Sequence, residues 1–346
     1  MTESEQRIVD GFSHVLPAEY KDALDSYAGG SHVVSGLLDS IPELTDVDRR
    51  LDLMDEHGVD VGVLTPASPP VETIADRRGA VELARTMNDG IARIATEHPD
   101  RFVGVATVPM NDPDAMVDEL DRAVTDLGLQ GALVYSSVDR RPADEPHLGG
   151  TGRPIDRPEL DPFYEAVTDL DVPIWLHPTR PKTVPEYVGE RDSKHLIWQL
   201  FGWPFELSAA MARLVFGGVF ERHPDLDVIA HHAGGMLPLL AGRMDVHAEL
   251  FETFGDADVG GDLSRPYVDH FRQFYVDSAT FGSVAALECA LEFFGPDRLL
   301  FGTDAPFDVD GGAVSVERSL EAVARLDVSE ADRRRIYGET MLDLLA

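Results

Sequence analysis

The sequence predicts a (β/α)8 TIM barrel, an α/β fold, with loop insertions at its C-terminal mouth. Three observations support this fold. Eight short apolar runs are spread evenly along the 346 residues, helix-period segments separate them, and polar residues follow the ends of several runs. An average of about 43 residues per strand and helix fits such a barrel with insertions. A doubly wound open sheet is the structural alternative.

Eight runs are expected to form strands, because each is rich in β-branched residues and is followed by turn or polar residues. Most of them are nearly continuous apolar stretches, which is typical of strands covered on both faces and therefore of a parallel sheet. The predicted strands are residues 7–10, 59–65, 102–108, 131–136, 173–177, 226–231, 274–277 and 299–303.

Segments rich in Ala, Leu, Arg and Glu separate the strands and have the period of amphipathic helices. The predicted helices are residues 48–57, 77–98, 114–127, 160–170, 207–223, 284–294 and 316–326. The extra length lies in long loops on the mouth side of the barrel, at residues 17–44, 139–158, 178–205 and 234–269. No shift in composition marks a boundary, so a single domain over residues 1–346 is expected.

Charge and composition exclude several classes of protein. The chain has 63 acidic and 29 basic residues, and the resulting net charge of -34 would repel nucleic acid and anionic membranes. The acids are spread over the whole chain and only three basic residues are lysines, which indicates a halophilic protein. Because Cys289 is the only cysteine and neither a signal peptide nor an apolar span of roughly 20 residues is present, we expect a cytoplasmic location.

Several polar residues follow predicted strands, where a barrel carries its active site. His14 comes after the first strand, His177 ends the fifth, His231 and His232 end the sixth, and Asp304 follows the eighth. The C-terminal ends of parallel strands meet at one mouth, so these side chains should converge. Imidazole and carboxylate groups are typical ligands of catalytic Zn, Mn or Fe. A single histidine is more often a surface residue, so the joint placement is what predicts a metal site.

The motifs around these positions resemble those of the amidohydrolase-related family, which includes 2-amino-3-carboxymuconate-6-semialdehyde decarboxylase, γ-resorcylate decarboxylase and several ring-product hydrolases. The resemblance covers nearly the whole chain, and the motifs occur in the family's order. They are Asp-x-x-x-His in the first strand, Leu-His-Pro in the fifth, His-x-Gly-Gly-x-x-Pro-x-x-x-Gly-Arg from His232, and Phe-Gly-Thr-Asp-x-Pro-Phe at residues 301–307.

The resemblance implies one divalent metal ion, with zinc as the expected ion and manganese or iron as alternatives. It implies that His14, His177 and Asp304 are the metal ligands. Phe12 stands where the family has another ligand on the first strand, and phenylalanine cannot bind a metal. A metal-free pseudo-enzyme or binding scaffold is therefore the alternative interpretation. His231 is an additional residue, which we expect to point to the other side of its strand.

The resemblance also implies roles for residues that contact the substrate. His232 matches the catalytic acid-base histidine, and Arg243 matches an arginine that holds a substrate carboxylate in the neighbouring subunit, which implies a homodimer. A surface salt bridge to Asp245 or another nearby acid would explain Arg243 equally well. The aromatic residues of segment 194–206 would either cap a pocket or pack on the barrel.

The expected function is that of a metal-dependent decarboxylase or hydrolase acting on a small carboxylated aromatic or ring-cleavage product. In a decarboxylase, His232 would direct protonation of the carbon and Arg243 would anchor the carboxylate; in a hydrolase, Asp304 would take a proton from the attacking water. An anionic substrate approaching this acidic protein requires a local basic cluster at the mouth. An oxidoreductase or phosphate-binding barrel is disfavoured, since no Gly-x-Gly-x-x-Gly opens a helix after a strand.

Overall fold

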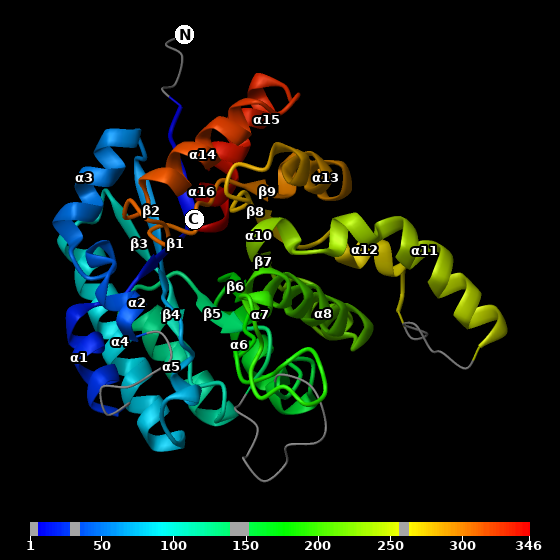
Figure 1. Cartoon of the computed structure of the whole chain (residues 1–346), viewed down its shortest axis with the longest axis horizontal. Coiled ribbons are helices and arrows are strands. Elements are labelled where there is room, and N and C mark those ends of the chain that lie inside the picture. The colour runs from blue at the N-terminus through cyan, green and yellow to red at the C-terminus, as the bar shows by residue number, and fades with distance from the viewer. Residues whose placement is uncertain (1–5, 28–34, 139–151, 256–262) are drawn as a thin grey trace.

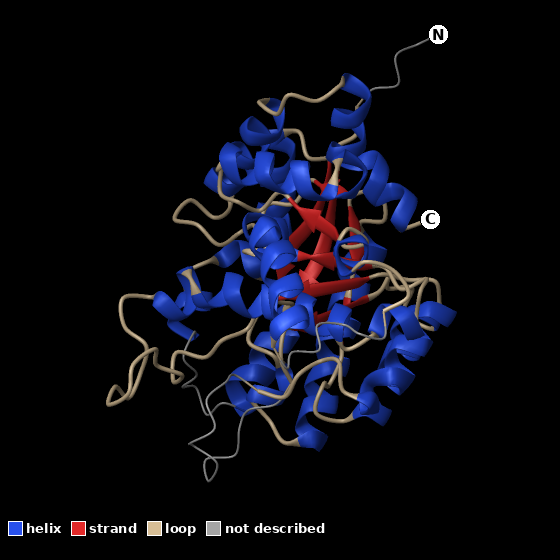
Figure 2. Ribbon diagram, turned by 90° about the vertical axis from the view of Figure 1, so that its right-hand side faces the viewer, coloured by secondary structure: helices blue, strands red, loops and turns tan. Residues whose placement is uncertain are grey.

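Parallel strands form the centre of the molecule, and helices surround them (Figures 1 and 2). The computed structural model describes residues 6–27, 35–138, 152–255 and 263–346. Within these ranges the strands are β1 (Val9–Val15), β2 (Val61–Pro66), β3 (Phe102–Gly104), β4 (Ala106–Thr107), β5 (Ala132–Tyr135), β6 (Ile174–His177), β7 (Val228–Ala230), β8 (Tyr275–Asp277) and β9 (Leu299–Leu300).

Main-chain hydrogen bonds join the strands in the order required by an eight-stranded barrel. The parallel neighbours are β1-β2-β3 and β4-β5-β6-β7-β8-β9. β3 and β4 are two parts of one strand, because Val105 between them donates its N–H to the Leu64 carbonyl at 3.0 Å. The first and last strands are linked where Gly11 N–H donates to the Phe301 carbonyl at 2.9 Å. The predicted (β/α)8 architecture is thus confirmed.

The helices begin at the side chains that the sequence offers as caps. Asp46, Asp76, Asp112 and Ser283 each accept a hydrogen bond from the backbone N–H three residues later. The α-helices are α1 (Ala18–Tyr27), α2 (Ser35–Asp39), α3 (Val47–His57), α4 (Arg77–Glu97), α5 (Pro113–Thr125), α6 (Asp161–Asp169), α7 (Ile197–Leu200), α8 (Gly202–Phe216), α9 (Val219–Arg222), α10 (His231–Gly234), α11 (Leu237–Phe254), α12 (Tyr267–Phe271), α13 (Val284–Phe294), α14 (Ala313–Ala324), α15 (Glu330–Arg334) and α16 (Thr340–Leu344). None of the helices in the described ranges is both long and apolar enough to cross a membrane.

Several predicted boundaries are wrong. The first strand does not stop at residue 10, because all seven residues of β1 are buried and the pairing with β2 continues to Val15. The predicted loop 234–269 contains the 18-residue helix α11, and the loops 17–44 and 178–205 contain α1, α2 and α7. Most of the predicted loop 139–158 lies outside the described residues.

Buried polar contacts hold β1 in place at the centre of the barrel. The indole N–H of Trp175, a fully buried β6 residue, donates to the Gly11 carbonyl at 2.9 Å. The buried Arg50 guanidinium donates to the His14 carbonyl and to the Ser13 hydroxyl. Because each of these donors has its acceptor on β1, they position the strand that carries His14.

Candidate metal centre and active site

Four side chains meet at the C-terminal ends of the strands. His14, His177 and His231 each place one ring nitrogen within 4.8 Å of the others. Asp304 Oδ1 lies 3.1 Å from His14 Nε2 and 3.2 Å from His231 Nε2. The predicted residues His14, His177 and Asp304 therefore lie at one site, and His231 connects them.

Each of the three imidazoles has its Nδ1 directed at an oxygen acceptor. His14 Nδ1 lies 3.2 Å from the Pro66 carbonyl, His177 Nδ1 lies 2.7 Å from the Pro178 carbonyl, and His231 Nδ1 contacts the Asp277 carboxylate. A nitrogen that faces such an oxygen acts as the donor, so the hydrogen is on Nδ1 and, in the neutral ring, Nε2 carries a lone pair. This is the orientation typical of metal-binding histidines with a supporting acceptor.

His231 faces the site, and the prediction that it points to the other side of the strand is wrong. Strand β7 ends at Ala230, so the alternation of a strand no longer applies to the next residues. His232 and Ala233 adopt left-handed backbone conformations with φ values of 50° and 55°. The chain turns sharply there, and the rings of His231 and His232 stack at 3.7 Å between centroids instead of pointing to opposite faces.

The proton affinities of these groups follow from their burial and their neighbours. Contacts with His14 and His231 hold the pKa of Asp304 well below 3.8, although burial alone would raise it. Burial lowers the pKa of His231, but the nearby carboxylates of Asp277 and Asp304 together have the larger effect and raise this pKa from 6.5 to about 9. Burial and the nearby imidazoles of His14 and His231 hold the pKa of His177 well below 6.5.

His232 lies beside this group in a different environment. A ring nitrogen of His232 lies within 4.8 Å of ligand atoms of His231 and Asp304. Its Nδ1 donates to the Ala279 carbonyl at 3.0 Å. Burial, assisted by the charge of His231, lowers the pKa of His232 to about 4, so the ring is neutral at pH 7 and able to accept a proton.

The side chains present fit a divalent ion. His14 Nε2 is buried and has no hydrogen-bond partner among the described residues, although it lies close to Asp304. Nitrogen ligands lie about 2 Å from zinc, so donors of one ion lie within about 4 Å of each other. The three imidazole nitrogens lie within 4.8 Å of one another, so small side-chain movements bring them to this separation. A group of imidazole and carboxylate donors suits zinc, manganese or iron.

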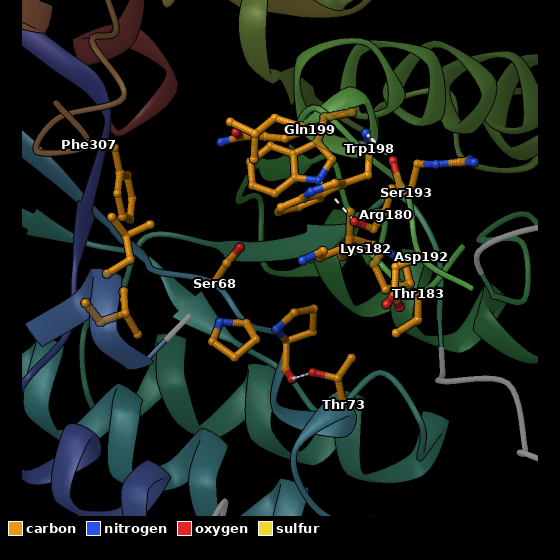
Figure 3. Close-up of a pocket in the computed structure, with 18 of the residues that line it drawn as sticks. Ser68, Thr73, Arg180, Lys182, Thr183, Asp192, Ser193, Trp198, Gln199 and Phe307 are labelled. Carbon is orange, nitrogen blue, oxygen red and sulfur yellow. Dashed lines mark hydrogen bonds between the residues drawn. The ribbon is translucent and has the colours of Figure 1, made fainter. Parts of the chain in front are cut away.

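A cavity of about 1890 Å³ leads to this group from the surface. His177 and Asp304 are part of its wall, together with Phe307 and the indole rings of Trp198 and Trp203. Figure 3 shows Phe307 and Trp198 on different sides of the space. A molecule that enters the cavity can therefore contact the histidine and aspartate group at His177 and Asp304.

The segment between β6 and α8 supplies basic side chains to the cavity, as expected for an anionic ligand. They are Arg180, Lys182, Arg191 and Lys194. Two of the three lysines in the chain thus line one cavity. Acidic residues, including Asp192, also line it. Arg180 donates to Glu206 at 2.7 Å, and Figure 3 shows Arg180 and Lys182 beside Thr183 and Asp192.

The aromatic residues of segment 194–206, predicted either to cap a pocket or to pack on the barrel, do not all have the same environment. Trp203 packs against His177 with 5.5 Å between ring centroids, and Trp198 contacts Trp203. Phe201 and Phe205 are exposed instead and do not line the cavity. The two tryptophans therefore form one wall of the site.

Arg243 lies apart from the other predicted site residues within a single chain. It is exposed on α11, which projects away from the strands (Figure 1), and it is not part of the cavity wall. The predicted alternative, an ion pair with Asp245 or another nearby acid, is not seen among the described residues. Leu239 and Phe254 of the same helix are 75% and 84% exposed.

Reasoning from the sequence missed two residues of the group. Asp277 ends β8 and supports His231, but no pattern in the sequence separates it from the other 62 acidic residues. Its position at the end of a strand was the one available signal. The role of His231 was missed because the left-handed turn after β7 is not visible in a pattern of apolar residues.

Known proteins are similar to this chain in sequence and in fold. The amidohydrolase family model matches residues 13–345. The γ-resorcylate decarboxylase of Rhodococcus jostii is 33% identical over 291 residues, which is 84% of each chain.

Solved structures show the same similarity. The 2,6-dihydroxybenzoate decarboxylase from Rhizobium has a TM-score of 0.81 and 30% identity, with 99% of each chain covered. A dihydroxybenzoic acid decarboxylase from Polaromonas sp., with bound manganese and the inhibitor 2-nitroresorcinol, has a TM-score of 0.79 and 32% identity, covering 99% of this chain and 97% of the other. Together with the family match, this places a known catalytic scaffold around the histidine and aspartate group. The chain therefore belongs to the amidohydrolase family and is an enzyme of its hydrolase and carboxy-lyase type.

Proposed function

We propose that the protein decarboxylates a small hydroxylated aromatic acid. The observation that carries this proposal is the cavity whose inner wall is formed by His177 and Asp304. The indole rings of Trp198 and Trp203 offer flat apolar surfaces to an aromatic ring, and Lys182 offers positive charge to a carboxylate. Relatives at 30% to 33% identity that decarboxylate dihydroxybenzoates support this substrate class.

The residues of the site have distinct roles in this proposal. A divalent ion held by His14, His177 and Asp304 would bind substrate oxygen and withdraw electron density. His232, neutral at pH 7, takes a proton from a solvent water in the cavity and delivers it to the ring carbon that carries the carboxylate. The bond between this carbon and the carboxylate then breaks, its electron pair returns to the ring, and carbon dioxide leaves.

The identity of the ion is part of the proposal. Zinc is the ion that we expect, because imidazole-rich sites suit it. Manganese is its competitor, since the Polaromonas structure contains manganese. Loading the metal-free protein with each ion separately and measuring the rate of carbon dioxide release identifies the one that supports activity.

A panel of hydroxybenzoates tests the proposed reaction. In heavy water, we expect carbon dioxide release with one deuterium incorporated at the former carboxylate position, because the proton comes from exchangeable groups. His232→Asn should lose this activity, whereas His57→Asn at the end of α3 should retain it. Release of an alcohol or amine from aromatic esters or amides, without carbon dioxide from any acid, would instead support a hydrolase.

The active unit that we propose is a homodimer. The exposed apolar residues of α11 include Leu239, Val246, Phe251 and Phe254, and a second copy of the chain would remove them from water. The cavity also exceeds the ~300–1,000 Å³ of a typical small-ligand site. A neighbouring subunit that brings Arg243 to the cavity would narrow it and add a carboxylate partner. Light scattering should give twice the chain mass, and a monomer at micromolar concentration would contradict the proposal.

We further propose that the acidic surface is an adaptation to salt. A net charge of -34 creates self-repulsion that salt screens, since the Debye length falls from about 10 Å at 0.1 M to about 3 Å at 1 M. The melting temperature should therefore rise from dilute buffer to molar KCl. An equal or lower value in KCl would contradict this adaptation.

A further inference from the structure

His231 lies beside every side chain expected to bind the ion, yet no role was predicted for it from the sequence. It directly follows β7 and is fully buried. One of its ring nitrogens lies within 4.8 Å of a ring nitrogen of both His14 and His177. Its Nε2 also lies 3.2 Å from Asp304 Oδ1. His231 is therefore the member of the group that links the two other imidazoles to the carboxylate.

We propose that His231 is itself a metal ligand, bound through Nε2, and that it completes a set of four protein ligands with His14, His177 and Asp304. This inference rests on the proposed function only in that the site holds a divalent ion. It does not depend on which substrate the enzyme uses. It assigns to β7 a donor that the first strand lacks, because Phe12 cannot bind a metal.

The hydrogen bonding of His231 supports binding through Nε2. Asp277 ends the neighbouring strand β8, and its Oδ2 contacts His231 Nδ1. A carboxylate at Nδ1 keeps the hydrogen there, so Nε2 of the neutral ring is free to bind a metal. Asp277 Oδ1 accepts the Ala279 N–H at 3.0 Å, which fixes the carboxylate as well. The imidazole is thus oriented before any ion arrives.

The charges around His231 also call for a cation. Asp277 and Asp304 are 1% and 8% exposed, and both contact this imidazole. No lysine or arginine forms an ion pair with either carboxylate in the part of the chain that the structure describes. Without an ion, the positive charge beside these two buried carboxylates is that of the His231 imidazolium, which leaves one negative charge unbalanced. A divalent ion that replaces the Nε2 proton of His231 supplies the missing charge.

Phe12 supports the ring of His231 from one side. The two rings are stacked, with 3.8 Å between centroids and 14° between planes, and Phe12 is fully buried. His232 stacks against His231 at 3.7 Å. Rotation of the imidazole out of the group would therefore require movement of two packed rings. Packing, hydrogen bonding and charge all favour the same orientation of Nε2.

Metal affinity measured without substrate tests this inference. His231→Asn is the informative variant, because the asparagine amide can still donate to Asp277 while the Nε2 donor is removed. His232→Asn is the matched control, since it changes the adjacent stacked ring and leaves the proposed ligands in place. We expect the dissociation constant for Mn(II), measured by the EPR signal of the free ion, to rise on the order of 100-fold or more in His231→Asn. The control should change it far less.

An unchanged Mn(II) dissociation constant in folded His231→Asn would overturn the inference. Circular dichroism and the melting temperature of the metal-free variant establish that it is folded. The wild-type protein gives a second measurement that needs no variant: X-ray absorption of the zinc-loaded protein should show three imidazole ligands, and two would contradict the proposal. A protein that binds metal through His231 but decarboxylates no aromatic acid would refute the proposed function alone.

Discussion

The bottom and the rim of the cavity are built in opposite ways. At the bottom, His14, His177 and His231 are at most 2% exposed, and each has its Nδ1 directed at an acceptor. At the rim, Lys182 and Arg191 are exposed on a segment that contains one short helix between β6 and α8. The barrel strands thus fix the bottom, whereas the positions of the rim side chains depend much less on the strands.

This difference separates two kinds of function. Groups that must hold one geometry, such as ligands of an ion, lie on rigid strand ends. Groups that we propose to attract or enclose a substrate lie on the segment between β6 and α8 and on α11. Substitutions at the bottom should therefore change metal binding and kcat, whereas substitutions at the rim should change KM and its salt dependence.

The largest effect is expected at the bottom of the cavity, from His177→Ala. Loss of this imidazole removes a proposed metal ligand, so the metal content should fall and activity should drop on the order of 1,000-fold. Elemental analysis and carbon dioxide release measure the two effects. His98→Ala, at the C-terminal end of α4 and away from the cavity, is the control. Unchanged behaviour of His177→Ala, together with metal-free wild-type protein, would favour the scaffold interpretation.

Asp277→Asn should have a smaller effect at the bottom. The amide oxygen can still accept the Nδ1 hydrogen of His231, but the negative charge is lost. Metal affinity should fall about 10–100-fold, as is typical for such supporting residues. Asp227→Asn, just before β7, provides the same chemical change away from the site. Equal metal affinities of the two variants would mean that Asp277 supports only the fold.

Arg243→Ala tests whether the rim includes a second chain. If Arg243 binds the substrate carboxylate of the partner, KM should rise about 10–100-fold with little change in metal content. Arg78→Ala, an exposed residue of α4, is the control. Mixing Arg243→Ala with His177→Ala should restore activity, because a mixed dimer has one complete site. No recovery from subunits shown to exchange would contradict the shared site.

Lys182→Gln is expected to have the smallest effect. Lys182 lines the cavity and forms no ion pair with the other described residues, so its charge attracts the substrate from solvent. Its loss should raise KM about 2–5-fold at low salt and less in molar KCl. Lys21→Gln removes the same charge on α1, away from the cavity. Identical KM values for the two variants would exclude a role for Lys182 in attracting the substrate.

Prediction from the sequence worked where one periodicity determines the structure. The buried run 173–177 becomes β6 and ends at His177, and residues 284–294 form α13 with the predicted bounds. It failed where the backbone departs from regular geometry. Gly11 and Ser13 interrupt the apolar pattern of the first strand, so its extension to Val15 was missed although pairing with β2 continues.

The candidate site was also predictable only in part, because some of its side chains depend on irregular backbone geometry. His14 and Asp304 could be placed because they follow strands that converge in a barrel. The direction of His231 depends on the left-handed conformation of His232, which no apolar pattern reveals. The role of Arg243 and the single-domain organisation stay predictions. The role of Arg243 is untested because the site that it is proposed to serve belongs to a second chain.

A crystal structure of the protein grown with Mn(II), with diffraction data collected on both sides of the manganese absorption edge, tests the central claim most directly. We predict one anomalous peak per chain, in contact with Nε2 of His14, His177 and His231 and with a carboxylate oxygen of Asp304. A peak at any other position, or no peak while these four side chains keep their present contacts, would contradict the account.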